Sequence, residues 1–294
     1  MSIRLEMLQV ARLAPKLLGD SAELVGRFIQ LQQNSDGGFK DRVGRSDLYY
    51  TVFGLDALTA LQLPLPTEQL RKFVTGFDPV TLDLVHLCAL IRCWAAVGEG
   101  GPRDAGGTLR ARLADFRARD GGYNPIPNSE HGTAYGAFLA VAAYQDMRTP
   151  IVDSSRLVES FNRLATIDGA WTNEVLPIAA IGATNATAAV VTVLRNLGAP
   201  ISSRAAEWLL ARTHPQGGFL AIPGAPIPDL LSTATALHAL AGLGVPLDPV
   251  KDACLDFIDT LWANDGAFHG NWTDDHLDCE YTFYGLLALG HLAV

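Results

Sequence analysis

A short glycine–aromatic motif recurs through this chain, and its spacing is the strongest constraint on the fold. The motif is DGGF at Asp36, DGGY at Asp120, DGAW at Asp168, QGGF at Gln216 and DGAF at Asp265. Successive copies are separated by 84, 48, 48 and 49 residues. The first gap is close to twice the others, and the sequence GFDP at 76–79 fits inside it as a degenerate copy. The chain therefore contains six repeats, and fixed periods of this size are typical of repeat architectures.

Two kinds of helical segment alternate with this motif. The segments before it have one charged face, as at 108–120, 154–168, 202–215 and 248–265. The segments after it are apolar nearly all round, at 51–62, 83–98, 133–145, 187–198, 233–244 and 282–294. A helix with one charged face lies at the surface, whereas a helix with no charged face must be buried. The pattern predicts an all-α fold of six helix hairpins, an (α/α)6 toroid with inner and outer helix layers. A closed ring is expected because neither end has the polar capping repeat that an open solenoid needs.

We expect one toroid domain over residues 1–294, with an extra N-terminal helix over 1–19 and repeats starting near 20, 66, 103, 151, 201 and 248. The hydrophobic content of 49% is enough for a substantial core. No apolar run approaches the roughly 18 residues of a membrane span, so no integral membrane segment is expected.

Charge and cysteine usage narrow the partners and the compartment. The formal net charge is −9, and no cluster of lysine and arginine resembles a nucleic-acid footprint, so no nucleic acid is expected. The four cysteines form no CxxC pair, and residues 1–19 lack the long apolar core of a secretory signal. These features favour a cytoplasmic protein.

The segment QQNSDGGFKDRVGRSDLYYTVFGLDALTAL, at 32–61, resembles the repeat shared by protein prenyltransferase beta subunits and the squalene and terpene cyclases. The resemblance extends through all the motifs and most of the chain. It implies an α/α toroid whose central cavity is lined by aromatics and accepts a hydrophobic isoprenoid. It does not by itself choose a reaction.

Both branches of this superfamily keep their chemistry just before a recurring residue of the buried helices. Here that residue is a threonine in five repeats, at Thr51, Thr133, Thr187, Thr233 and Thr282. Similarity to the prenyltransferases implies a zinc site with three ligands. Two of them precede the threonine of the fifth repeat, an Asp four residues before it and a Cys two residues before it. The third is a His one residue before the threonine of the sixth repeat. This chain has Asp229, Leu231 and Tyr281 at those places. Shifted by one repeat, the places hold Asp278, Glu280 and Tyr50.

Neither set contains the thiolate and imidazole of the family pattern. Trp272, Asp274 and Asp275 lie where an Arg/Lys pair is expected to hold a diphosphate. Both differences weigh against a prenyl-diphosphate transferase. The run TDDHLDCE at 273–280 is rich in ligand types, but its spacing matches no recognised zinc motif. We expect no cofactor, with zinc or magnesium as the alternative.

The cyclases protonate an alkene or epoxide from a DxDDT-like motif at the same place. DCEYT at 278–282 resembles it, with Glu280 in the place of the central acid and Tyr281 next to it. Such a reaction needs a protonated carboxylic acid in an apolar cavity and aromatic faces that stabilise a cation. We predict that Glu280 is the acid and that Asp278 sets its hydrogen bonding.

The predicted substrate-binding residues come from three repeats, the first, the third and the sixth. Three aromatics lie two residues after the recurring threonine: Phe53, Tyr135 and Tyr284. The others are Tyr50 and His131. His131 belongs to the third repeat, which lies opposite the repeat of Glu280 in a ring of six repeats. A second interpretation makes His131 a rim residue bonded to a neighbouring loop. Asp278 also has a second interpretation, as a helix N-cap. Aspartate recurs four residues before the threonine at Asp47 and Asp229, as expected of helix N-caps.

The leading hypothesis is an isoprenoid-processing enzyme like the class II terpene cyclases, in which Glu280 protonates a polyene. The alternatives are a protein-prenyltransferase beta-subunit-like protein with divergent zinc ligands and a non-catalytic toroid that binds lipids or proteins. The chain has no room for the second helical domain that such cyclases often have. Either a single toroid suffices or a partner subunit completes the site.

Overall fold

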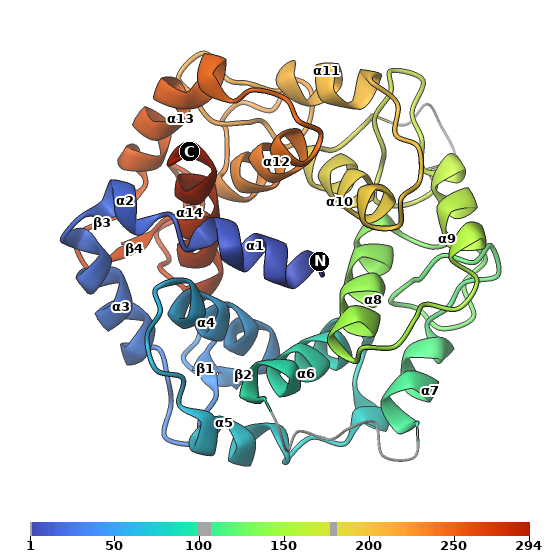
Figure 1. Ribbon diagram of the computed structural model, residues 1–294, viewed down its shortest axis with the longest axis horizontal. Coiled ribbons are helices and arrows are strands. Elements are labelled where there is room, and N and C mark those ends of the chain that lie inside the picture. The colour runs from blue at the N-terminus through green and yellow to red at the C-terminus, as the bar shows by residue number, and fades with distance from the viewer. Residues whose placement is uncertain (1, 99–106, 177–180) are drawn as a thin grey trace.

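The computed structural model describes residues 2–98, 107–176 and 181–294, which form two concentric rings of helices (Figure 1). The inner ring consists of α4 (Leu48–Ala60), α6 (Leu84–Val97), α8 (Ala134–Asp146), α10 (Thr184–Asn196), α12 (Leu230–Gly242) and α14 (Cys279–Leu292). The outer ring consists of α3 (Ser21–Leu31), α5 (Thr67–Val74), α7 (Thr108–Asp115), α9 (Ser154–Ser160), α11 (Arg204–Leu210) and α13 (Asp248–Thr260). This arrangement confirms the predicted (α/α)6 toroid. The predicted repeat start near 103 lies outside the described residues.

The ring closes where its last repeat meets its first. Helix α14 packs against both α12 and α4. The motif glycine Gly266 has a φ of +89°, and a Cβ there would lie 2.3 Å from the main-chain oxygen of Leu24 in α3. The motif glycine Gly217 lies equally close to the following outer helix, α13. A Cβ at Gly217 would lie 1.7 Å from the main-chain oxygen of Ala253. Each of these turns therefore presses against the next outer helix, which a side chain would prevent.

In three of the hairpins, the recurring threonine and the motif aromatic join the turn to the inner helix. The N–H of Phe39 donates to the Oγ1 of Thr51 over 2.9 Å, and Phe39 is fully buried. The corresponding bonds join Trp171 to Thr187 and Phe219 to Thr233. Two motifs add two-residue strand pairs, β1 (Phe39–Lys40) with β2 (Ser46–Asp47) and β3 (Trp262–Ala263) with β4 (Ala267–Phe268). Two short 3₁₀ turns, η1 (Pro79–Thr81) and η2 (Phe161–Arg163), lie between these helices.

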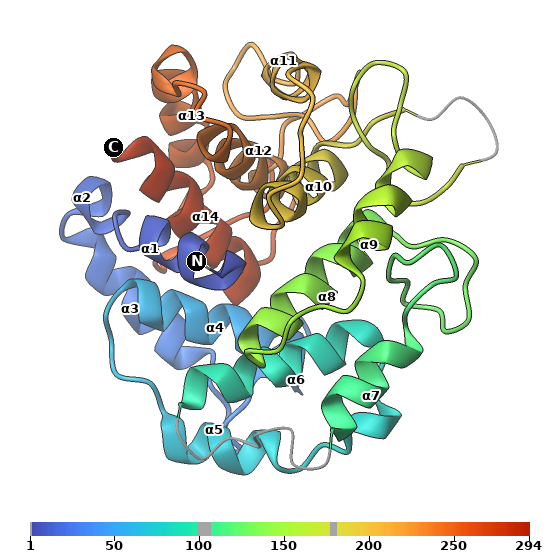
Figure 2. The same ribbon diagram turned by 45° about the vertical axis from the view of Figure 1, so that its right-hand side comes forward.

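The N-terminal segment closes one end of the ring. It forms α1 (Ile3–Ala11) and α2 (Pro15–Leu18), and both views place α1 beside α4 and α14 (Figures 1 and 2). Its contacts are with the carboxyl-terminal halves of the inner helices. The N–H of Ile3 donates to the Oε1 of Gln145 over 2.9 Å, and the Nε of Arg4 lies 3.2 Å from the Oδ1 of Asp56. The carboxyl-terminal end of the inner ring is therefore a covered floor.

The inner helices contain 13 or 14 residues each. At 1.5 Å per residue, this corresponds to roughly 20 Å of helix. Nowhere in the described segments is a helix both long enough and apolar enough to cross a membrane.

Candidate active site

The inner helices enclose a cavity of about 510 Å³. Each helix lines it from the second residue onward, at spacings of three and four that place side chains on one face. Helix α14, for example, contributes Glu280, Phe283, Tyr284 and Leu287. The walls are mostly apolar, and Met7 of α1 lies in the lining. The volume is within the range of pockets that bury a small organic ligand, about 300–1,000 Å³.

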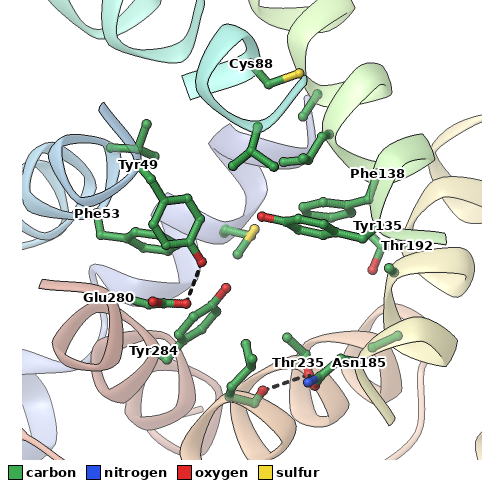
Figure 3. Close-up of a pocket in the computed structure, with 18 of the residues that line it drawn as sticks. Tyr49, Phe53, Cys88, Tyr135, Phe138, Asn185, Thr192, Thr235, Glu280 and Tyr284 are labelled. Carbon is green, nitrogen blue, oxygen red and sulfur yellow. Dashed lines mark hydrogen bonds between the residues drawn. The ribbon is translucent and has the colours of Figure 1, made fainter. Parts of the chain in front are cut away.

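Glu280 is the acidic residue at the open end of this cavity. It lies in the first turn of α14, and its Oε1 accepts a hydrogen bond from the Tyr49 hydroxyl over 2.6 Å (Figure 3). The pKa of Glu280 is raised to about 7, mainly by burial; the negative charge of Asp278 acts in the same direction, and the Tyr49 hydrogen bond and Arg42 act against it. Since that value is close to neutrality, a large share of Glu280 is protonated at physiological pH.

Aromatic side chains surround this acid. The ring centroids of Phe53 and Tyr284 are 5.5 Å apart, and those of Tyr49 and Phe53 are 5.0 Å apart. The hydroxyls of Tyr135 and Tyr284 point toward the middle of the cavity (Figure 3). Tyr135 is 37% exposed, so solvent reaches this end of the ring. The structure thus brings three predicted aromatics, Phe53, Tyr135 and Tyr284, to the same cavity as Glu280.

Asp278 has a different place from the one predicted. Its Oδ1 accepts the N–H of Tyr281 and so caps α14, and its Oδ2 accepts a hydrogen bond from the Nε of Arg42 over 2.8 Å. Asp47 and Asp229 cap α4 and α12 in the same way, which confirms the N-cap interpretation. The prediction that Asp278 sets the hydrogen bonding of Glu280 is wrong, because Tyr49 is the donor to Glu280. Asp278 acts on Glu280 through its charge alone.

His131 lies outside the cavity lining, in the loop before α8. Its Nδ1 is 3.4 Å from the Oδ2 of Asp120, and its main-chain oxygen accepts a hydrogen bond from Asn124. The cause is the start of α8 at Ala134, one residue after the recurring threonine. Helices α4, α10, α12 and α14 start three residues before theirs. The missing turn removes His131 from the inner face, and Tyr135 enters the cavity as the second residue of α8 instead.

Tyr50 also lies outside the cavity lining. Successive residues of a helix point about 100° apart, so Tyr49 faces inward and its neighbour faces the contact between α4 and α14. There burial raises the pKa of Tyr50 to about 12, with the negative charges of Asp278 and Glu280 adding and Arg42 opposing.

Reasoning from the sequence missed Tyr49, the hydrogen-bond donor to Glu280. A signal was present, because Tyr49 and Glu280 occupy equivalent places, two before the recurring threonine, in repeats that adjoin in a closed ring. It also missed Arg92 and Asp146, which line the closed end. Their signal is a charge on a helix that is otherwise apolar.

The residues at the family's zinc positions do not fit a zinc ion. Asp229 accepts bonds from both the N–H and the hydroxyl of Ser232, and Leu231 offers no ligand atom. In the shifted set, Asp278 is engaged by Arg42. Over residues 2–98, 107–176 and 181–294, no group of three or more His, Cys, Asp or Glu side chains is arranged to hold a metal ion.

Comparison with solved structures shows what shares this fold. Candida albicans protein geranylgeranyltransferase-I complexed with GGPP superposes with a TM-score of 0.69 at 15% identity, over 92% of this chain and 90% of that one. The apo type II terpene cyclase MstE from Scytonema gives a TM-score of 0.60 at 18% identity, over 94% and 97%. A glycosidase in complex with glucose gives 0.55 at 13% identity, over 97% of both chains. The shared fold therefore does not select a chemistry.

Comparison with curated protein sequences gives no match. The family model of the prenyltransferase alpha-alpha toroid domain matches residues 7–98 and 183–293, which is more than half of the chain. Together with the six-hairpin ring, this match shows that the chain belongs to the prenyltransferase alpha-alpha toroid domain family.

Proposed function

We propose that this protein is a type II isoprenoid cyclase, in which Glu280 protonates a polyene held in the central cavity. The observation that carries the proposal is the position of the Glu280 carboxyl. It lies in a mostly apolar, aromatic-walled cavity, with Tyr49 as its hydrogen-bond donor and a pKa raised to about 7 by burial. A carboxylic acid kept protonated near neutral pH is what alkene protonation requires.

The geometry divides the work between the two oxygens of Glu280. Oε1 accepts the Tyr49 hydroxyl, which leaves Oε2 to carry the proton. The O–H bond breaks as a C–H bond forms at one alkene carbon, and the other alkene carbon becomes a cation. The π electrons of the next alkene then form the ring C–C bond. The resulting cation ends by losing a proton to water, and solvent at the open end reprotonates Glu280.

The surroundings favour this step in two ways. Charge-assisted hydrogen bonds are roughly twice as strong as neutral ones, so the bond from Tyr49 strengthens as Glu280 becomes a carboxylate. Phe53 and Tyr284 line the same space, and aromatic rings there stabilise positive charge.

The two alternatives have less support. A diphosphate-dependent prenyltransferase needs free cationic groups and the family's zinc ligands, whereas Arg42 near the open end pairs with Asp274 and Asp278. Prenyl transfer would therefore require a partner subunit that supplies these cationic groups and zinc ligands. A non-catalytic lipid-binding toroid would have the same cavity but would need no titrating acid in it.

The test is the Glu280→Gln variant assayed on linear polyenes and their epoxides, with cyclic products identified by mass spectrometry. We expect turnover to fall by about 10²–10⁴, the usual contribution of a general acid, with ligand affinity retained. Glu130→Gln is the matched control, since Glu130 is an exposed loop residue paired with Arg119. Unchanged turnover in Glu280→Gln would refute the proposal. If the unmodified protein binds these substrates but converts none of them, the non-catalytic toroid is favoured.

A further inference from the structure

The closed end of the cavity contains a second set of polar groups, far from Glu280. Arg92, Asp146, Thr192 and His238 belong to the lining and come from four different inner helices. On α8, Tyr135 is the second residue and Asp146 is the last. The interval of 11 residues corresponds to roughly 16 Å along the helix axis. The cavity therefore has an acid and aromatics at its open end and a charged floor at its closed end.

The charges of this floor are balanced. Asp56 is 1% exposed and lies between two guanidinium groups, with its Oδ2 2.5 Å from Arg92 and its Oδ1 3.2 Å from Arg4. Asp146 is the fourth charged residue at this end of the cavity, beside Asp56, Arg92 and Arg4. The positive charges of Arg92 and Arg4 act on it. With Asp146 ionised, two positive charges face two negative ones. An anionic ligand group therefore finds no net positive charge at the floor.

Within the described part of the chain, no donor forms a hydrogen bond to the Asp146 carboxyl. None of the hydrogen bonds or ion pairs among the described residues reaches its carboxyl, and its buried Oδ2 has no partner there. The Nε of Arg92 is likewise buried without an acceptor in the described part of the chain. Burial raises the pKa of Asp146 to about 6, which still leaves the group mostly ionised at neutral pH. Buried polar groups of this kind are normally satisfied, because an unsatisfied one costs free energy.

We propose that the floor formed by Arg92 and Asp146 binds the uncharged hydroxyl end of an isoprenoid alcohol or phenol, and so directs the far alkene end toward Glu280. A hydroxyl donates one hydrogen bond and accepts another, which matches the carboxylate of Asp146 and the N–H of Arg92. A diphosphate meets the negative charge of Asp146 and guanidinium groups that are already paired. A pure hydrocarbon leaves both groups unsatisfied. The proposed function supplies the isoprenoid nature of the ligand, and the structure of the floor supplies the hydroxyl.

The experiment is equilibrium binding of three probes to the full-length protein: geranylgeraniol, the hydrocarbon of the same skeleton without the hydroxyl, and geranylgeranyl diphosphate. We expect the alcohol to bind about tenfold or more tightly than either of the others, as for a hydrogen bond to a charged group. Equal affinities for the alcohol and the hydrocarbon would overturn the proposal and indicate a floor occupied by water alone. This ranking needs no variant and no turnover.

A variant then assigns the effect to the carboxylate. Asp146→Asn is expected to weaken alcohol binding by about tenfold, to leave hydrocarbon binding within about twofold, and to strengthen diphosphate binding because the floor gains a net positive charge. Asp252→Asn, an exposed change of the same kind on α13, should alter none of the three. An equal loss for alcohol and hydrocarbon in Asp146→Asn would contradict the assignment. If the alcohol preference holds but no cyclic product forms with any substrate, the proposed catalysis fails and the binding inference stands.

Discussion

The hydrogen bond between Tyr49 and Glu280 makes a quantitative prediction about the pH dependence of turnover. Tyr49→Phe removes a single hydroxyl, which lies 2.6 Å from the Oε1 of Glu280 and stabilises its ionised form. A hydrogen bond to a charged group contributes about 1.5–3 kcal/mol. Each pKa unit corresponds to about 1.36 kcal/mol. The pKa of Glu280, about 7 in the native protein, should therefore rise by about 1–2 units in the variant.

The direction of the rate effect follows from the protonated form being the reactant. Turnover is expected to be constant below the pKa of Glu280 and to fall about tenfold per pH unit above it. In Tyr49→Phe the constant region should extend to roughly pH 8–9. The measurement is kcat/KM between about pH 5 and pH 9.5, and a ¹³C NMR titration of the Glu280 carboxyl gives the same pKa without turnover.

The control is Tyr50→Phe, the same change at the next residue of α4, whose side chain lies outside the cavity lining. It should leave the pKa of Glu280 nearly unchanged. A Glu280 pKa that stays in place or falls in Tyr49→Phe would refute the reasoning, because it would mean that the Tyr49 hydroxyl does not stabilise the carboxylate.

Three stability predictions follow from three other features: the partly buried Glu280, the helix cap Asp278 and the motif glycine Gly217. The folded-state pKa of Glu280 is raised from 4.5 to about 7, so ionising it costs stability as the pH rises through this interval. Glu280→Gln should therefore be more stable than the unmodified protein by roughly 1–3 kcal/mol at pH 9 and equally stable near pH 4, as measured by urea unfolding; an equal difference at both pH values would contradict this. Asp278→Ala removes both the N-cap of α14 and the ion pair with Arg42, and should cost about 1–3 kcal/mol in the same assay, whereas a loss below about 0.5 kcal/mol would show that neither contact stabilises the fold. Gly217→Ala puts a Cβ 1.7 Å from a main-chain oxygen of α13 and should lower the melting temperature far more than Gly244→Ala, which has a similar φ of +75° but no atom within 4 Å; equal losses would show that the backbone conformation, not the close approach, requires glycine at this motif.

The fold could be predicted from the sequence because its determinants are local and repeated. Each motif places glycines at a turn and an aromatic ring under the next inner helix, and this pattern occurs often enough for the period to be visible. The N-caps at Asp47, Asp229 and Asp278 were predictable for the same reason. An N-cap depends on residues two or three positions away, and the same aspartate recurs in three repeats.

The site was predictable only in part. Phe53, Tyr135, Tyr284 and Glu280 lie in the cavity lining, as expected from their places relative to the recurring threonine and from the family resemblance, while their roles stay predictions. His131 was misplaced because α8 lacks the first turn that α4, α10, α12 and α14 have, and helix ends depend on capping and packing that periodicity does not show.

Taken alone, the sequence determined six hairpins, two layers and the capping aspartates, since all of these depend on residues close together in the chain or on their repetition. Only the tertiary structure decided which polar groups meet. Tyr49 and Glu280 are 231 positions apart and become partners because the ring closes between α4 and α14. Arg4 reaches Asp56 because α1 covers the floor. The raised pKa values of Glu280 and Asp146 arise mainly from burial. How deeply one carboxyl is buried depends on the whole packed ring, so the neighbouring sequence does not give the size of its pKa shift.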